Sequence, residues 1–81
     1  MDGFEARLVD LIAEESGMDP GSLKASQGLM STGVLDSFAL VTVISFVETH
    51  LGEEVPPADL TFDNFDTIAS ICGYVERALA A

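Results

Sequence analysis

Eighty-one residues suffice for one small domain, and a hydrophobic content of 48% is enough for a single core. The 14 acidic and 3 basic residues give a formal net charge of −11, which argues against nucleic acid or an anionic membrane as partner. One cysteine, Cys72, excludes a disulfide framework, and with one histidine it offers no metal site, so we expect a buried thiol.

No apolar run approaches the ~20 residues of a membrane span, and the acidic start lacks a signal pattern. We therefore expect a cytoplasmic monomer with one domain over residues 1–81.

The first amphipathic stretch runs from Asp2 to Ser16, with charged residues on one face and apolar residues on the other. Asp2 can cap the start of this helix, and Gly17 suits a left-handed helix end. The apolar positions are Phe4, Leu8, Leu11 and Ile12.

Residues 18–35 are punctuated by glycine, proline, serine and threonine, which predicts a long loop with a short turn near 22–25. A loop of this length in so small a domain is uncommon and is usually either functional or disordered. Its apolar residues predict a loop held against the core; they are Leu23, Leu29, Met30, Val34 and Leu35.

The most apolar helical run covers Ser37 to Leu51, and Gly52 ends it. Asp36 is a good N-cap, since its carboxylate can accept from backbone N–H groups one turn on. Ser37 then falls on the first helical residue, where a serine could carry a phosphate diester. Taken alone, this pair is better explained as a plain helix start.

This helix is apolar beyond its expected core stripe, which comprises Leu40, Val43, Ile44, Val47 and Leu51. Phe38, Val41 and Phe46 extend the apolar surface, and a small bundle cannot bury such a helix all round. We expect a contact surface near Phe38 and Val41; folding of Phe38 onto the long loop is the alternative. His50 is expected to be a solvated residue at the helix end, neither base nor ligand.

Thr61 to Phe65 predicts one short helical turn, capped by Thr61, with Phe62 and Phe65 turned inward. A last helix then runs to about Ala80. Either Asp66 or Thr67 caps it, Gly73 suggests a close helix crossing, and its apolar stripe comprises Ile68, Ile71, Cys72, Val75 and Leu79.

No period-two strand pattern occurs, so the expected fold is all-α, with three main helices, one short helix and a long first loop.

Catalysis by this chain's own side chains finds no support. Ser37 and His50 lie 13 residues apart on one helix, about 20 Å at ~1.5 Å per residue, and cannot form a catalytic pair. The acidic segment 59–66 lacks the glycine and glutamate of a calcium loop. We expect no catalytic residue and no bound metal.

The hexapeptide Gly33–Phe38 resembles the attachment motif of acyl and peptidyl carrier proteins. The resemblance spans nearly the whole chain, because the acidic first helix, the long loop and the segment 62–71 also match. It implies a small four-helix bundle in which a transferase moves 4′-phosphopantetheine from coenzyme A onto Ser37, with Asp36 as a motif residue. The arm's thiol then holds an acyl or aminoacyl group as a thioester.

Fatty-acid carriers of this family have several acidic residues on the second helix. Here Glu48 is the one acid left, and the other positions are Ala39, Thr42, Ser45 and Thr49. We therefore expect partners to dock through Phe38 and Val41 more than through charge, with Glu48 as the single acidic contact.

The resemblance implies three kinds of partner: a phosphopantetheinyl transferase, an enzyme that loads the acyl or aminoacyl group, and downstream acyl-processing enzymes. The missing acids favour a specialised polyketide, nonribosomal peptide or D-alanyl-type pathway. The alternative function is a non-catalytic acidic helical adaptor that binds a partner through residues 37–51 and carries no arm.

Overall fold

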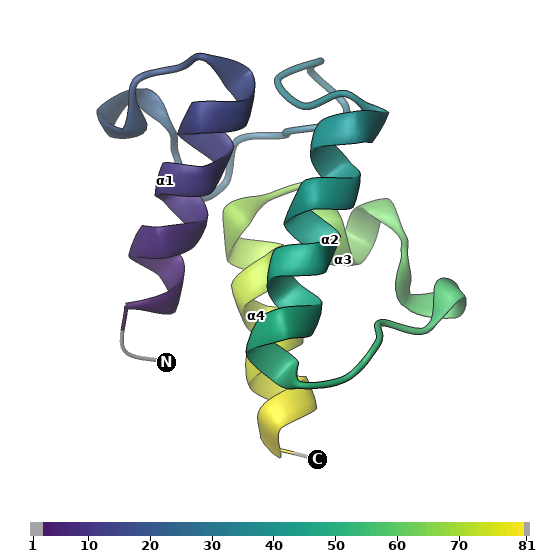
Figure 1. Cartoon of the computed structure of the whole chain (residues 1–81). Coiled ribbons are helices and arrows are strands. Elements are labelled where there is room, and N and C mark those ends of the chain that lie inside the picture. The colour runs from purple at the N-terminus through teal and green to yellow at the C-terminus, as the bar shows by residue number, and fades with distance from the viewer. Residues whose placement is uncertain (1–2, 81) are drawn as a thin grey trace.

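The computed structural model describes residues 3–80, which form four α-helices and two short 3₁₀ turns without any strand (Figure 1). The elements in chain order are α1 (Phe4–Ser16), η1 (Pro20–Ser22), α2 (Ser37–Leu51), η2 (Pro57–Asp59), α3 (Phe62–Phe65) and α4 (Ile68–Ala80). The prediction of an all-α fold with three main helices and one short helix is confirmed. Asp2, the predicted cap of the first helix, lies outside the described residues.

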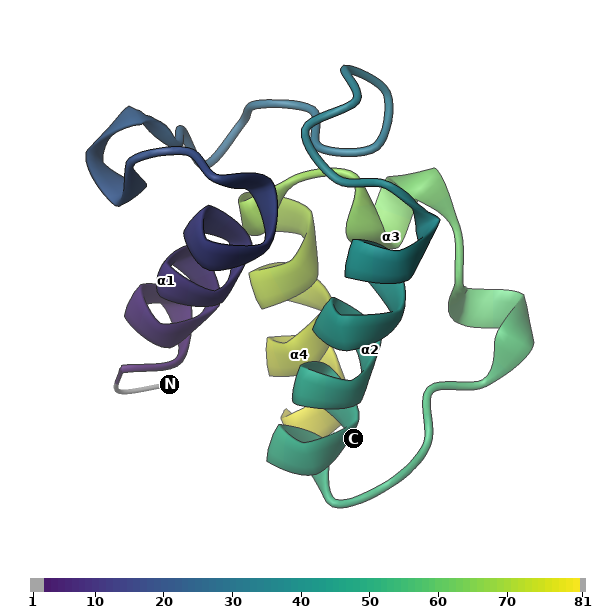
Figure 2. The same ribbon diagram turned by 45° about the horizontal axis from the view of Figure 1, so that its top comes forward.

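The three long helices contact one another pairwise, and α3 packs against α4. In Figure 1 α1 runs upward while α2 and α4 run downward, and in Figure 2 α3 lies at the upper end of the bundle, where α4 begins. The fully buried side chains come from all three long helices and from the first loop. They are Phe4, Leu8, Ile12, Leu29, Leu35, Val43, Val47, Ile68, Ile71 and Val75.

The core-facing side of α2 differs from the predicted stripe. Ala39, Val43 and Val47 are buried, whereas Leu40, Ile44 and Leu51 are half-buried at the edge of the core. Apolar residues surround most of this helix, so periodicity alone could not determine which side the rest of the bundle covers.

Three expectations for the last third of the chain are wrong. Phe62 is 65% exposed, because the four-residue helix α3 offers one inward position and Phe65 occupies it. Leu79 is 51% exposed in the last turn of α4. Gly73 marks no helix crossing, since a Cβ there would meet only the end of the Arg77 side chain, at 3.3 Å.

The long loop is held against the core, as its apolar residues predict. Leu29 and Leu35 are buried, and Leu23, Met30 and Val34 pack against the core from outside. The turn expected near 22–25 forms slightly earlier, as η1. A backbone hydrogen bond of 3.0 Å from Ala69 to Ala25 ties the middle of the loop to α4.

Asp66, at the junction of α3 and α4, binds the same loop. Its Oδ1 accepts hydrogen bonds from the amides of Met30 (2.7 Å) and Ser31 (3.0 Å), and its Oδ2 accepts from the Ser31 hydroxyl (2.7 Å). The Asp66 carbonyl accepts from the amide of Leu29 at 2.6 Å. Hydrogen bonds from Ser31, and then from Met30 and Leu29, hold the pKa of the Asp66 carboxyl below its ordinary value despite some desolvation.

The α4 cap is therefore Thr67, the second of the two candidates. Its hydroxyl accepts from the Ser70 amide at 3.0 Å.

Asp66→Asn should lower the free energy of unfolding by about 1 kcal/mol at neutral pH, a modest value because the carboxylate is partly exposed. A carboxyl whose pKa is depressed by folding stabilises the folded chain above its unfolded pKa of about 3.9, and this contribution disappears as pH falls through the folded pKa. Urea unfolding should thus show a stability gap between wild type and Asp66→Asn that is full near pH 7 and closes below about pH 4.

Asp63→Asn is the control, because Asp63 is an exposed carboxylate three residues away that makes no bond to residues 28–35. A pH of about 2.5 lies more than one unit below the unfolded pKa of the carboxyl. If the stability difference between wild type and Asp66→Asn stayed constant down to that pH, the hydrogen bonds of the Asp66 carboxylate would not be its source.

Candidate functional site

Asp36 and Ser37 form the start of α2 at one end of the molecule. Asp36 is extended (φ −92°, ψ −178°), and its Oδ1 accepts a hydrogen bond of 2.8 Å from the Ala39 amide. Asp36 is therefore the N-cap that the sequence predicts. Ser37 is the first residue of the helix and is exposed, so its hydroxyl is open to another molecule.

The backbone at this helix start suits an attached anion. Among residues 3–80, the amides of Ser37 and Phe38 have no hydrogen-bond partner, whereas the next two amides bind Asp36. Free amides at the positive end of a helix stabilise a negatively charged group. An exposed serine hydroxyl beside two free amides fits a covalently attached phosphate.

The residues before Asp36 lead into this position through a tight turn. Gly33 has φ +79° and donates its amide to the Met30 carbonyl at 3.2 Å, a conformation that a residue with a side chain would adopt only under strain. Leu35 is buried, and its amide bonds to the Leu29 carbonyl at 3.0 Å. The chain is thus anchored in the core two residues before the serine.

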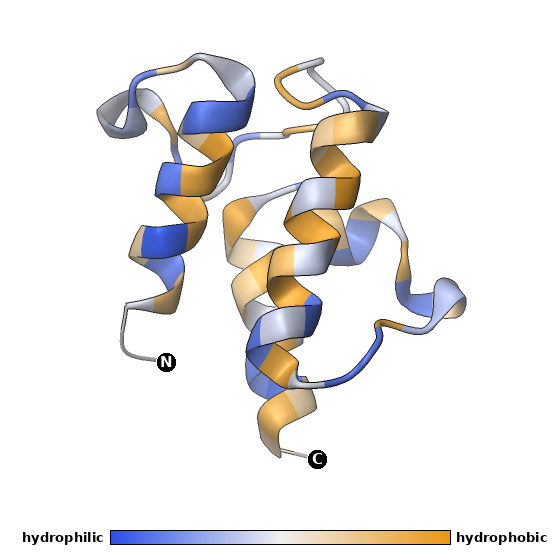
Figure 3. Ribbon diagram, viewed as in Figure 1, coloured by the Kyte–Doolittle hydropathy of each residue, from blue (hydrophilic) through white to orange (hydrophobic). Residues whose placement is uncertain are grey.

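An exposed apolar surface adjoins the serine. Phe38 is 84% exposed and Val41 is 61% exposed, so Phe38 does not fold back onto the loop. Figure 3 shows the upper turns of α2 as mostly hydrophobic on the visible side. Phe62, on α3, is a further exposed apolar ring; the sequence predicted it inward because aromatic residues are usually buried.

Comparison with known proteins decides the family. The family model described as "Phosphopantetheine attachment site" matches residues 6–75. The chain belongs to this family of carrier proteins. Its cofactor is a covalently attached phosphopantetheine.

Two curated relatives and one solved structure illustrate the similarity. D-alanyl carrier protein 1 of Lactiplantibacillus plantarum is 32% identical over 77 residues, which is 95% of each chain. An acyl carrier protein of Bdellovibrio bacteriovorus is 25% identical over 71 residues, covering 88% of each. The solution structure of a holo acyl carrier protein from Nitrosomonas europaea superimposes with a TM-score of 0.74 and 27% identity, and the match covers 100% of each chain.

Glu48, the single acid on α2 of the carrier protein, has an intramolecular contact. Its Oε2 accepts a hydrogen bond of 2.8 Å from the Val55 amide and thereby fastens the segment that follows α2. Its predicted role in docking stays a prediction, with one carboxylate oxygen already bound. Ala39, one of the positions compared with acidic residues in fatty-acid carriers, is buried and does not belong to the exposed surface.

His50 and Cys72 lie in packed positions away from the serine. The His50 ring is half-buried and lies 4.5 Å from the Phe4 ring, so it is less solvated than predicted. Cys72 is buried as expected, and desolvation, aided by nearby Glu5 and Glu76, raises the pKa of its thiol. The structure does not bring either residue to Ser37.

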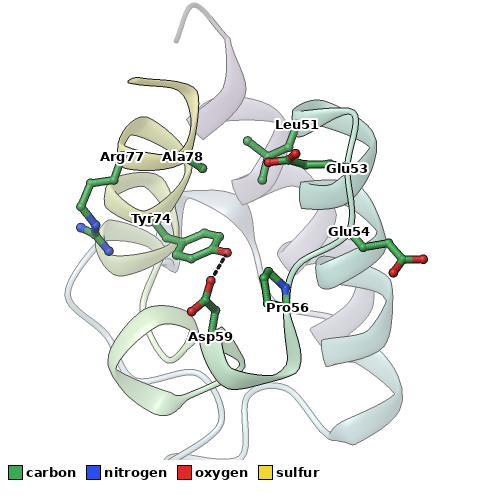
Figure 4. Close-up of a pocket in the computed structure, with 8 residues that line it drawn as sticks. All are labelled: Leu51, Glu53, Glu54, Pro56, Asp59, Tyr74, Arg77 and Ala78. Carbon is green, nitrogen blue, oxygen red and sulfur yellow. Dashed lines mark hydrogen bonds between the residues drawn. The ribbon is translucent and has the colours of Figure 1, made fainter. Parts of the chain in front are cut away.

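A cavity of about 390 Å³ lies at the other end of α2 (Figure 4). It is lined by Leu51 and by residues of α4 and the segment 53–59, so about 20 Å of helix separates it from Ser37. Tyr74 points into it and donates to Asp59 Oδ2 at 2.7 Å, and desolvation, with that hydrogen bond, raises the pKa of Tyr74 to about 12. The residues that line the cavity do not include Ser37 or Asp36.

Within residues 3–80, His, Cys, Asp and Glu form no group of three that could hold a metal ion. None of the helices in the same range combines the length and the apolar character needed to cross a bilayer.

Asp36→Ala should lower the free energy of unfolding by about 1 kcal/mol, whereas Asp36→Asn should cost only a few tenths (about 0.3 kcal/mol) because an asparagine caps nearly as well. Chemical denaturation of the three proteins measures both values. Equal losses in the two variants would show that the charge of Asp36 matters more than its capping hydrogen bond.

Proposed function

We propose that the carrier protein bears its phosphopantetheine on Ser37 and presents an acyl or aminoacyl group to partner enzymes. The observation that carries this proposal is the exposed hydroxyl of Ser37 at a helix start with two free amides, within the part of the chain that matches the attachment family. Asp36 fixes the first turn of α2, so the hydroxyl faces outward without any unfolding of the bundle.

Attachment requires a transferase and coenzyme A. The hydroxyl oxygen of Ser37 bonds to the phosphorus that bears pantetheine, the pyrophosphate P–O bond breaks, adenosine bisphosphate leaves, and the hydroxyl proton passes to a base of the transferase. The attached group supplies a thiol that holds the cargo as a thioester, and tethering raises the concentration of the cargo at each docked enzyme. The carrier itself contributes no catalytic residue in this proposal.

The proposed pathway is a specialised one that handles an aminoacyl or modified acyl unit. One relative is named a D-alanyl carrier protein, which supports a D-alanyl-type role, and polyketide and nonribosomal peptide synthesis are the other candidates. In each case the partners are a phosphopantetheinyl transferase, a loading enzyme and downstream acyl-processing enzymes. The proposal treats the chain as a single carrier domain that acts as a cytoplasmic monomer.

Docking in this proposal relies on apolar contact beside the serine. Phe38 and Val41 are exposed on the first turns of α2, and Phe62 on α3 is a further exposed apolar side chain. Glu48, which is half-buried, offers at most its second carboxylate oxygen to a partner. Burial of one large apolar side chain contributes about 1.5–3 kcal/mol, enough to orient a transient complex.

Incubation with a broad-specificity phosphopantetheinyl transferase and coenzyme A should add the mass of one phosphopantetheine to the wild-type chain. Ser37→Ala should abolish the addition, because the acceptor oxygen is lost. Ser45→Ala, which removes another exposed serine of α2, is the matched control and should be modified like the wild type. Intact-protein mass spectrometry measures all three, and an unmodified wild type beside a modified control carrier would instead favour the adaptor function.

Phe38→Asp should raise the transferase KM for the carrier by about tenfold or more, since it replaces an apolar contact by a charge. Leu79→Asp makes the same type of change on an exposed residue at the far end of α4 and should leave KM unchanged. Similar kinetics for Phe38→Asp and Leu79→Asp would mean that Phe38 does not contact the transferase.

A further inference from the structure

Residues 28–35 form a closed loop immediately before the helix that bears Ser37. The Thr32 hydroxyl donates to the Gly28 carbonyl at 2.6 Å, and the backbone bond from Leu35 to Leu29 closes the two ends. Leu29 and Leu35, which flank the closed part, are both buried in the core. The exposed tip of this loop is therefore connected to the start of α2 by a short, hydrogen-bonded and buried segment.

Asp66 holds this loop from the junction of α3 and α4. In the described part of the chain, it is the only residue outside the loop whose side chain hydrogen-bonds to residues 28–35. Its three side-chain bonds reach half-buried Met30 and exposed Ser31, which are 36 and 35 positions away in sequence. No equivalent contact is available from α1 or α2.

Gly28 lies against this contact and leaves room for it because glycine has no side chain. A Cβ at this position would collide with the Ser31 hydroxyl oxygen and lie 3.2 Å from Asp66 Oδ2. The glycine therefore lets the loop close tightly around the carboxylate. Close packing at Gly28 and the hydrogen bonds at Met30 and Ser31 together form a specific contact between the loop and the Asp66 carboxylate.

We propose that Asp66 is a positioning residue for attachment of phosphopantetheine to Ser37, although it contacts neither the serine nor Asp36. A transferase that binds around Ser37 meets the loop tip together with the start of α2. Ordering a free loop during binding costs conformational entropy, and a loop that is already ordered avoids that cost. The inference rests on the proposed attachment at Ser37. It adds that Asp66, which is remote from Ser37 in sequence, controls recognition of the carrier by the transferase.

Steady-state kinetics of modification, with the full chain as variable substrate and saturating coenzyme A, test the proposal. Asp66→Ala should raise KM for the carrier about tenfold while kcat changes less than about twofold, because Ser37 itself is intact once bound. Asp66→Asn should fall between wild type and Asp66→Ala, since its amide oxygen still accepts hydrogen bonds. Asp63→Asn removes a neighbouring exposed charge and should behave as wild type.

Tyr74→Phe separates positioning from a general loss of stability. It removes a hydrogen bond to a carboxylate at the far cavity, so it weakens the fold without touching the loop, and its KM should equal that of the wild type. Amide hydrogen exchange in Asp66→Asn should accelerate more at Met30 and Ser31 than at buried Val43, because Val43 reports only the loss of global stability.

Two results would overturn the proposal. If Asp66→Ala and Asp66→Asn are modified with the wild-type KM, Asp66 does not position the loop for the transferase. If Tyr74→Phe raises KM as much as Asp66→Ala, the effect is one of stability alone. An unmodified wild type overturns attachment at Ser37 itself and is thereby distinguished from both.

Discussion

The hydrogen bonds from Leu29, Met30 and Ser31 to Asp66 connect the middle of the chain to the junction of its last two helices. Twenty residues separate α1 from α2, and an irregular segment of that length gains no stability from a helical ladder of its own. Buried leucines, a backbone bond from Ala69 to Ala25 and the carboxylate of Asp66 hold it in place instead. The loop that Asp66 fastens ends directly before Asp36 and Ser37, at the start of α2.

The second constraint is the division of α2 into two apolar sides. One side, with Ala39, Val43 and Val47, is buried against α1 and α4, while Phe38 and Val41 remain exposed near Ser37. The exposed side chains belong to the same end of the helix as the serine. A partner that reaches the serine therefore also meets apolar surface, whereas the acidic residues of the chain lie mostly elsewhere.

Local rules of helix formation predicted most of the fold and the candidate site. Asp36 and Gly52 bound α2 at the predicted residues, and Asp36 and Thr61 cap their helices through the predicted side chains. Periodicity did not predict which side of α2 is buried, because this helix is apolar over most of its circumference. It also failed for Phe62, because α3 is too short to have two distinct faces. The role of Asp66 could not be predicted, because its partners lie 35 or more residues away and only the tertiary fold brings them together.

The hydrogen bond between Glu48 and the Val55 amide has a consequence for the lifetime of complexes. With its one acid engaged internally, α2 has little local charge with which to orient an approaching enzyme, even though the whole chain is strongly negative. In the proposed docking mode, affinity resides in a few apolar side chains, and changes in such contacts act mainly on dissociation rates. The lifetime of a complex in this mode is therefore set by these apolar contacts rather than by charge.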